Sequence, residues 1–188
     1  MSFFPAYLSL KNKKVLLVGG GVIALEKLEK LIDFTENITV IAKEISLDFL
    51  SFAQKYNIII EERLYRRGDI LGYDIVIVAT DTVEFHKAIY EESRTTRVLV
   101  NSVDDTAYCD FIFPSYVKKG DLTISVSTGG ASPAMAKRLR IYLEKLIPLA
   151  IEPFLQEMKK LRKSMPKGKQ RMQFFEDKSD EFMKKHFK

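Results

Sequence analysis

Val15-Leu16-Leu17-Val18-Gly19-Gly20-Gly21-Val22-Ile23-Ala24 is the stretch that decides the fold of this 188-residue chain. Its first four residues are all apolar, which predicts a strand buried on both faces of a sheet. The apolar residues from Ala24 onward recur at helical spacing, which predicts an amphipathic helix. The glycines between them complete the order strand, Gly-x-Gly-x-x-Ala, helix, which is typical of a dinucleotide-binding unit.

The small residues of this turn each serve a physical purpose in such a unit. Gly19 permits the tight turn, Gly21 lets a pyrophosphate approach the backbone, and Ala24 lets the helix pack closely on the strand. The start of the helix adds oriented N–H groups and a partial positive charge, which favour an anion. A glycine triplet alone is often a plain turn, so this prediction depends on the flanking strand and helix.

Strand and helix patterns continue to alternate after the glycine turn. Four more strands are expected, at residues 38–42, 58–61, 74–79 and 98–100, with helical stretches at 46–56 and around 85–89. This alternation predicts an α/β fold with a Rossmann-like, doubly wound parallel sheet.

Several polar residues follow the ends of these strands. Ligands of such sheets bind at the carboxyl ends of the strands, so Lys43-Glu44, Thr80-Asp81 and residues 101–104 are expected to share one rim with the glycine turn. Glu44 is the nearest candidate for an acid that holds the adenosine ribose, although the neighbouring Lys43 complicates that assignment. Asp81 is expected to be a helix cap or a ribose neighbour.

The character of the chain changes after Asp110. Two strands, 111–115 and 122–127, are expected around a turn at 118–121, and Ser132-Pro133 is a strong helix start. A helix with an apolar stripe follows, and further helical stretches begin at Pro148 and Lys169. We therefore predict three parts: a dinucleotide-binding Rossmann domain at 1–113, a small α+β region at 114–147 whose apolar surface suits dimerisation, and a C-terminal helical domain at 148–188. The apolar lead-in 3–10 is expected to pack under the sheet edge.

Composition narrows the class of protein. A hydrophobic content of 46% and a charged content of 29% are typical of a globular protein. No apolar run approaches the roughly 20 residues of a membrane span, and the N-terminus lacks the pattern of a secretory signal. The single cysteine, Cys109, excludes an internal disulfide, fits a reducing cytoplasm, and is expected to be a small buried apolar residue.

The net charge of +5 is concentrated from Lys137 to the C-terminus. No stacking platform or groove-reading motif accompanies the basic residues, so we do not expect nucleic acid as a partner. An anionic small molecule or a solvated helical face explains the charge more simply.

A series of motifs in this sequence resembles a known family. The motifs are Pro5–Leu10, the Val18-Gly19-Gly20-Gly21 turn, Ala79-Thr80-Asp81, Asn101-Ser102-Val103-Asp104, Phe111-Ile112-Phe113-Pro114 and the segment from Ser127 to Pro133. In this order and spacing they resemble the precorrin-2 dehydrogenase/sirohydrochlorin ferrochelatase family of sirohaem biosynthesis, in its free-standing form.

The resemblance implies NAD-dependent oxidation of precorrin-2 to sirohydrochlorin, with or without subsequent insertion of Fe²⁺ as a substrate. It implies a catalytic proton acceptor at Asp104, a tetrapyrrole substrate, and a homodimer. It also implies cofactor-binding residues, namely Gly19, Gly21, Val22, Ile23, Lys43, Glu44, Thr80 and Asp81. The implied substrate-binding residues are Asn101, Ser127, Thr128, Gly129 and Gly130.

Other interpretations remain open at this point. Asp104 lies beside Asp105 in a turn-like stretch, where aspartates commonly serve as turn formers. The two histidines, His86 and His186, do not suggest a bound metal site. The alternative functions are a dinucleotide-sensing regulatory module without catalysis and a purely structural dimerisation protein.

Overall fold

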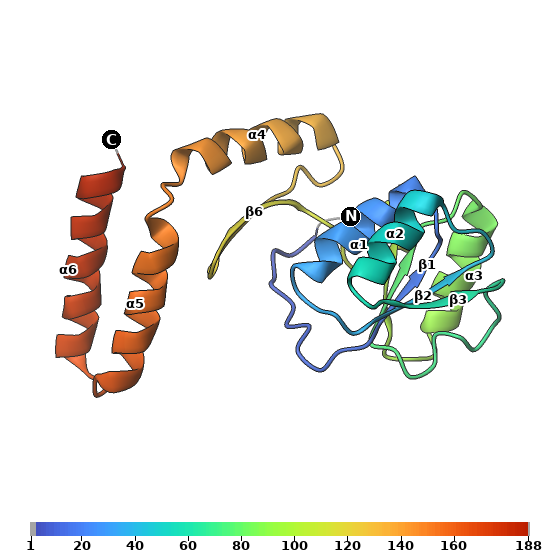
Figure 1. Ribbon diagram of the computed structural model, residues 1–188, viewed down its shortest axis with the longest axis horizontal. Coiled ribbons are helices and arrows are strands. Elements are labelled where there is room, and N and C mark those ends of the chain that lie inside the picture. Colours follow the sequence, from blue (N-terminus) through green and yellow to red (C-terminus); the bar gives the residue numbers. More distant parts are fainter. Residues whose placement is uncertain (1–2, 188) are drawn as a thin grey trace. The chain divides into compact units, whose positions relative to one another are not determined.

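A computed structural model describes residues 3–187 of the chain. It consists of two compact units, residues 1–113 and 114–188, each of which is described here by itself (Figure 1). The division of the chain into three domains stays a prediction.

The first unit is built on a five-stranded parallel sheet. Its strands have the order β3-β2-β1-β4-β5, which confirms the predicted doubly wound topology. They are β1 (Val15–Val18), β2 (Ile38–Ala42), β3 (Ile59–Glu62), β4 (Ile75–Val78) and β5 (Leu99–Ser102). Helices cover both faces (Figure 1): α1 (Val22–Ile32) and α2 (Leu47–Lys55) on one, and α3 (Val83–Ser93) on the other.

The core explains why the central strands have no polar face. Leu17 of β1 packs with Leu28 of α1 and Phe49 of α2, whereas Leu16 packs with Ile89 of α3 on the opposite face. Successive residues of a strand point to opposite faces, so a sheet covered on both sides needs continuous apolar strands.

The register of the sheet brings the strand ends to one level. Val18 pairs with Ile41 on one side and with Val78 on the other, and Val78 pairs with Ser102. The segments that follow β1, β2, β4 and β5 therefore begin side by side at the carboxyl edge.

The second unit begins with an antiparallel hairpin of β6 (Ser115–Lys119) and β7 (Leu122–Val126). The prediction of a first hairpin strand at 111–115 is wrong, because Phe111 and Phe113 instead pack against the core of the first unit. The strand includes Lys118 and Lys119, and the turn is confined to Gly120 and Asp121.

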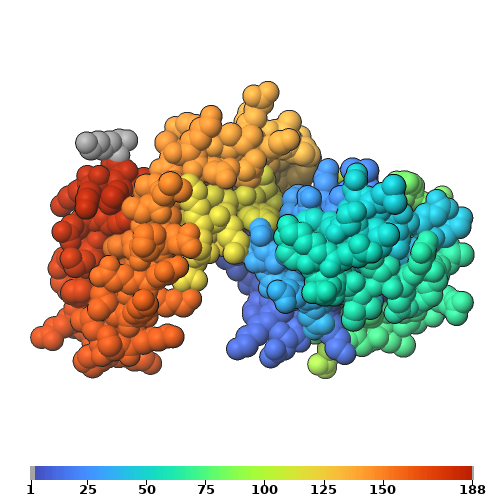
Figure 2. Space-filling view, viewed as in Figure 1, coloured from blue at the N-terminus to red at the C-terminus, as the bar shows by residue number. Residues whose placement is uncertain are grey.

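Three helices follow the hairpin: α4 (Pro133–Leu146), α5 (Ile151–Ser164) and α6 (Lys169–His186). Helices α5 and α6 run antiparallel (Figure 1) and lie against each other (Figure 2), and the rings of Phe154 and Phe182 stack with their centroids 4.2 Å apart. The predicted start of α4 is confirmed, since the Ser132 hydroxyl accepts a hydrogen bond from the Met135 N–H and Pro133 is the first helical residue. Across residues 3–187, no helix is long and apolar enough to cross a membrane.

The N-terminal lead-in does not behave as expected. Phe4 is 88% exposed and Tyr7 is also exposed, so the prediction that residues 3–10 pack under the sheet edge is wrong for most of the segment. Only Leu10 packs against the core, because α1 and α2 already cover that face of the sheet.

Candidate functional site

The three glycines after β1 differ in what surrounds them. Gly19 has a φ of +129°, and a Cβ atom there would collide with the carbonyl oxygen of Ala79. A Cβ on Gly20 would collide with the carbonyl oxygen of Glu44. By contrast, a Cβ on Gly21 would meet nothing within 4 Å. The first two glycines are therefore required by the fold, whereas Gly21 faces open space.

That open space lies over the start of α1. Gly21 is the N-cap residue, and it provides no side-chain hydrogen bond to the helix. The first turn also contains no acidic residue, so the N–H groups of its residues, Val22 and Ile23 among them, keep their positive end available. This arrangement fits the pyrophosphate of a dinucleotide.

The end of β2 carries the expected charged pair. The Nζ of Lys43 lies 3.3 Å from Oε1 of Glu44, and the two side chains are 68% and 85% exposed. An ion pair this exposed holds neither group firmly, so both side chains are free to turn toward a ligand. The backbone beside them is fixed, since Ser46 N–H donates to the carbonyl of Gly20 over 2.9 Å.

A pocket of about 290 Å³ lies at the carboxyl ends of β4 and β5. It brings together four of the predicted site residues from three separate segments, namely Ile23, Thr80, Asp81 and Asp104. Val83, His86, Val103, Ala79 and Asp105 complete its lining.

The structure separates the two neighbouring aspartates of this pocket. Asp105 uses its carboxylate to accept the Ala107 N–H at 3.0 Å, where it caps the short 3₁₀ helix η1 (Thr106–Tyr108). Asp104 has a φ of +65°, a left-handed conformation that aspartate and asparagine adopt more readily than other non-glycine residues, as Asn12 and Asn57 do in this chain. The Asp105 carboxylate is therefore committed to the cap, whereas Asp104 occupies the left-handed position of the turn and lines the pocket.

Unpartnered polar atoms gather at the same edge. Within residues 3–187, the buried side-chain atoms without a hydrogen-bond partner are Thr80 Oγ1, His86 Nδ1, Asn101 Oδ1 and Ser102 Oγ. They lie just after β4, near the start of α3 and at the end of β5. Buried polar groups are normally paired with protein groups, water or a ligand, so this edge is where such additional partners would bind.

His86 is a pocket residue that the sequence did not reveal. It is only 4% exposed, and its Nε2 lies 2.8 Å from the carbonyl oxygen of Thr80. Because a carbonyl can only accept, Nε2 carries a proton, and Nδ1 is the ring nitrogen left without a partner. The sequence does place His86 on the helix that follows Thr80-Asp81, but it does not show that this histidine is buried.

Lys27 is a second residue that sequence analysis missed. It is half-buried on α1, and its Nζ lies 5.2 Å from the centroid of the Phe113 ring. Burial is the main cause that lowers the pKa of Lys27, and the neighbouring Lys30 lowers it further, while the charge of Asp104 opposes the shift. Lys27 therefore places a basic group within electrostatic range of Asp104.

Asn101 is buried at the end of β5 and has a structural partner. Its Nδ2 donates to the carbonyl of Phe111 over 2.9 Å. Its Oδ1 alone remains without a partner, so any substrate contact would use that atom. The predicted contact with substrate stays a prediction.

The remaining predicted substrate residues lie in the second unit, in the loop before α4. Gly129 and Gly130 both have positive φ angles. The hydroxyls of Ser127 and Thr128 accept the N–H groups of Gly129 and Ser132, which shapes the loop from within. Their predicted role in substrate binding also stays a prediction.

No metal-binding cluster stands out in the described part of the chain. Among residues 3–187, no group of three or more His, Cys, Asp or Glu side chains is placed to hold a metal ion.

Comparison with known proteins places this site in context. The siroheme synthase of Pseudoalteromonas translucida is 34% identical over 177 residues, which are 94% of this chain and 37% of that protein. The siroheme synthase of Nitrosococcus oceani is 35% identical over 150 residues, 80% of this chain and 32% of that protein. The chain thus spans about a third of the length of these relatives. Among solved structures, SirC, a precorrin-2 dehydrogenase, has a TM-score of 0.74 at 24% identity, with 90% of this chain and 85% of that chain covered, and so shares the fold.

Family comparison covers most of the chain. Residues 6–115 match the family described as "Putative NAD(P)-binding", and residues 119–146 match the one described as "Sirohaem biosynthesis protein central". The resemblance drawn from the motifs is confirmed at this level: the chain belongs to the family described as "Putative NAD(P)-binding" and continues into the sirohaem biosynthesis central segment.

Proposed function

We propose that the protein is an NAD-dependent dehydrogenase that oxidises precorrin-2 to sirohydrochlorin. The observation that carries the proposal is the pocket at the carboxyl edge, where Ile23 at the start of α1 and Asp104 after β5 line one space. The names of the siroheme synthase relatives and of SirC support the choice of substrate. A dinucleotide-dependent oxidation requires a proton acceptor close to the bound cofactor. The pocket offers the Asp104 carboxylate beside the N–H groups at the start of α1.

The residues around α1 fit NAD. The free N–H groups of Val22 and Ile23 are suited to the pyrophosphate, and Gly21 leaves the space above them open. Glu44 is able to accept hydrogen bonds from ribose hydroxyls, and its negative charge disfavours an added 2′-phosphate, which selects NAD over NADP. Thr80 and Asp81 extend the binding edge toward Asp104. When bound, NAD⁺ supplies the hydride acceptor.

Asp104 takes the proton in this reaction. Conversion of precorrin-2 to sirohydrochlorin removes a hydride and a proton, so the balanced products include NADH and H⁺. Asp105 is committed to capping η1, and His86 is buried with its Nε2–H bonded to Thr80. Asp81 also lines the pocket, but we assign it to the cofactor with Thr80, so Asp104 is the carboxylate that we assign as general base.

The same base is suited to a second reaction, insertion of Fe²⁺ into sirohydrochlorin. Metal insertion displaces two pyrrole protons, and a carboxylate over the macrocycle is able to accept them. We include Fe²⁺ in the proposal as a substrate that passes through the site.

We also infer that the protein is a cytoplasmic homodimer. The predicted stripe of α4 includes Leu143, which is half-buried, and four other apolar side chains that are between 41% and 60% exposed: Met135, Leu139, Tyr142 and Leu146. An apolar helix face of this kind is typical of an interface between copies. The loop at 127–130, which leads into α4, is the proposed contact for the substrate.

The decisive test replaces Asp104 by Asn and measures NADH formation with precorrin-2. Because a general base contributes about 10²- to 10⁴-fold, Asp104→Asn should lower kcat by that order while NAD⁺ still binds. Asp105→Asn is the matched control, since an amide oxygen preserves the cap on Ala107. Near-normal turnover by Asp104→Asn would refute the assignment, and NAD⁺ binding without any oxidation by the unmodified protein would favour a regulatory module.

A further inference from the structure

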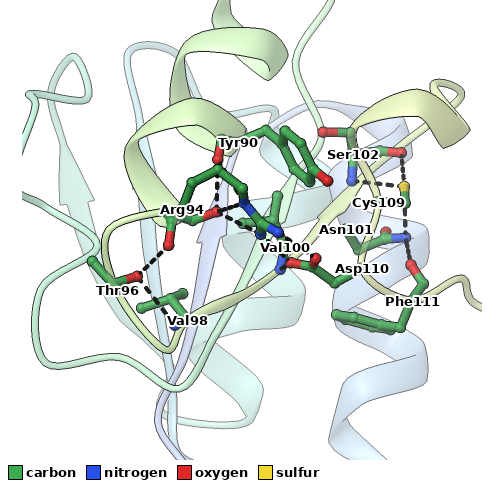
Figure 3. Close-up of polar contacts among 11 residues, drawn as sticks. Tyr90, Arg94, Thr96, Val98, Val100, Asn101, Ser102, Cys109, Asp110 and Phe111 are labelled. Atoms are coloured by element: carbon green, nitrogen blue, oxygen red, sulfur yellow. Dashed lines mark hydrogen bonds and ion pairs between the residues drawn. The ribbon is translucent and has the colours of Figure 1, made fainter.

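The outer edge of β5 is covered by the segment Cys109–Phe111 (Figure 3). β5 is the last strand of the sheet, so the N–H groups of Val100 and Ser102 have no strand partner on that side. The carboxylate of Asp110 accepts the Val100 N–H at 2.9 Å, and the sulfur of Cys109 accepts the Ser102 N–H at 3.2 Å. Two side chains thus replace the missing strand.

The segment is itself held in place by an arginine. Both guanidinium nitrogens Nη1 and Nη2 of Arg94 bond to the Asp110 carboxylate, at 2.9 and 2.6 Å. Planar two-point contacts of this kind are among the stronger hydrogen-bonded pairs. Cys109, the neighbouring residue, is therefore presented to β5 from a fixed position.

The Cys109 sulfur touches both sides of the turn that carries Asp104. Sγ lies 3.1 Å from the carbonyl oxygen of Ser102 and 3.3 Å from that of Asp105, so the single S–H proton is shared between the residues that flank Val103 and Asp104. Together with the N–H of Ser102, these contacts close residues 102–105 around one atom. Asp104 occupies the outward side of this turn, in the pocket lining.

The chemistry of the thiol fits this task. Cys109 is buried, and burial is the main cause that raises its pKa, with the charges of Asp105 and Asp110 adding to the effect. A thiol that stays protonated keeps the S–H donor that the two carbonyls require. It is also a poor nucleophile, which argues against a direct chemical role.

We propose that Cys109 is a positioning residue for Asp104: its thiol closes the 102–105 turn and holds Asp104 in the left-handed conformation that directs the carboxylate into the pocket. The proposal rests on the proposed function for the catalytic role of Asp104. The contacts of Cys109 with the turn are observed independently of that function. A φ of +65° is less favourable than a helical or extended φ even for aspartate, so contacts that hold the turn contribute to keeping it. The contacts of Cys109 with Ser102 and Asp105 add to the backbone bond from the Asp105 N–H to the Ser102 carbonyl, which is long at 3.4 Å.

The test begins with two variants of Cys109 in the full chain. Cys109→Val keeps an apolar group of similar size but removes the donor and the acceptor, whereas Cys109→Ser keeps both with a shorter reach. We expect Cys109→Val to lower kcat for precorrin-2 oxidation by about tenfold or more, since small misplacements of a catalytic group carry losses of that size. The KM for precorrin-2 and the Kd for NAD⁺ should stay within about twofold. Cys109→Ser should recover part of the lost kcat.

A matched control separates positioning from general loss of stability. Ile38→Val removes one methylene from a buried residue at the start of β2, the opposite end of the sheet from Asp104. It should lower Tm without lowering kcat. The proposal is overturned if Cys109→Val loses no more kcat than Ile38→Val, or if KM and kcat change together.

Two further measurements keep this proposal distinct from the proposed function. In the double variant Cys109→Val/Asp104→Asn, kcat should equal that of Asp104→Asn alone, because residues acting through one group are not additive. Amide hydrogen exchange needs no substrate: Ser102 and Asp105 should exchange faster in Cys109→Val than in Ile38→Val. Unchanged exchange in Cys109→Val would overturn the positioning role, whether or not precorrin-2 is the substrate. If exchange is faster in Cys109→Val but the unmodified protein does not oxidise precorrin-2, only the proposed function is overturned.

Discussion

At the residue scale, the glycine turn separates what the fold needs from what a ligand needs. Gly21→Asp should abolish NAD⁺ binding, because it places a carboxylate where the pyrophosphate is expected. The same change should leave Tm unchanged or slightly raised, since Asp is a better N-cap than Gly and α1 has no side-chain cap. Isothermal titration with NAD⁺, paired with thermal unfolding, checks both expectations.

Gly20→Ala should have the opposite effect to Gly21→Asp, because it changes stability first. Its Cβ would collide with the carbonyl of Glu44, so the variant should unfold at lower denaturant concentration, with a loss of about 1 to 3 kcal/mol. Undiminished NAD⁺ affinity in Gly21→Asp, or full stability in Gly20→Ala, would contradict this division of roles.

At the scale of elements, a lysine ties the hairpin of the second unit to its first helix. The Nζ of Lys119 in β6 donates to the carbonyls of Glu144 and Ile147, at 3.0 and 2.6 Å, where α4 ends. A cation at a helix C-terminus is worth about 0.3 to 1 kcal/mol or somewhat more when partly buried. Lys119→Met keeps the aliphatic stem and loses the charge, so the amides at the end of α4 should exchange faster. Lys118→Met is the neighbouring control, and equal exchange in both variants would count against the role of Lys119.

A contact between the segments before β1 and β4 predicts how the stability of the first unit changes with pH. The carboxylate of Asp74, just before β4, accepts from Lys13 Nζ at 2.7 Å and from the Lys14 N–H before β1, and these contacts lower its pKa, with Lys13 the larger cause. The pKa of Asp69 is lowered in the same way, chiefly by its hydrogen bonds with Arg63. A carboxyl with a lower pKa in the folded state stabilises the fold above its unfolded pKa, and that stability is lost as pH falls through the folded value.

Urea unfolding should therefore show a falling midpoint as the pH drops below about 4, where unfolded aspartates begin to take up protons. Asp74→Asn should make this dependence shallower, whereas Asp48→Asn, on the exposed first turn of α2, should change it less. An acid dependence in Asp74→Asn identical to that of the unmodified protein would exclude the contribution of Asp74.

At the scale of the whole molecule, the two units differ in how much they bury. The first has apolar layers on both faces of its sheet, whereas in the second, among the described residues, the buried apolar side chains are Val117, Ala136 and Phe182. We expect the second unit to complete its packing against a second copy through α4. Light scattering at micromolar concentration should give a dimer, and Tyr142→Glu should shift it toward monomer.

Met172→Glu is the matched control for this prediction. Met172 is 64% exposed, similar to Tyr142 at 60%, but it lies on α6 outside the proposed interface. A monomeric unmodified protein, or equal dissociation by both variants, would contradict the proposed interface.

The sequence by itself determined the sheet, the glycine turn and the start of α4. These features are written in local patterns: continuous apolar strands, Gly-x-Gly-x-x-Ala, and Ser132-Pro133 as cap and first helical residue. Local patterns are readable because backbone sterics and side-chain periodicity act within a few residues.

Only the tertiary structure decided how the polar residues divide the work. It assigned Asp105 to a helix cap and left Asp104 in the pocket, buried His86 against Thr80, and made Cys109 a hydrogen-bonding centre where only a small apolar residue was expected. It also moved the first hairpin strand to Ser115, because Phe111 and Phe113 found the core of the first unit. Some of these outcomes depend on contacts between segments far apart in the chain, and others on which of two adjacent side chains turns inward. Neither produces a periodic pattern in the sequence.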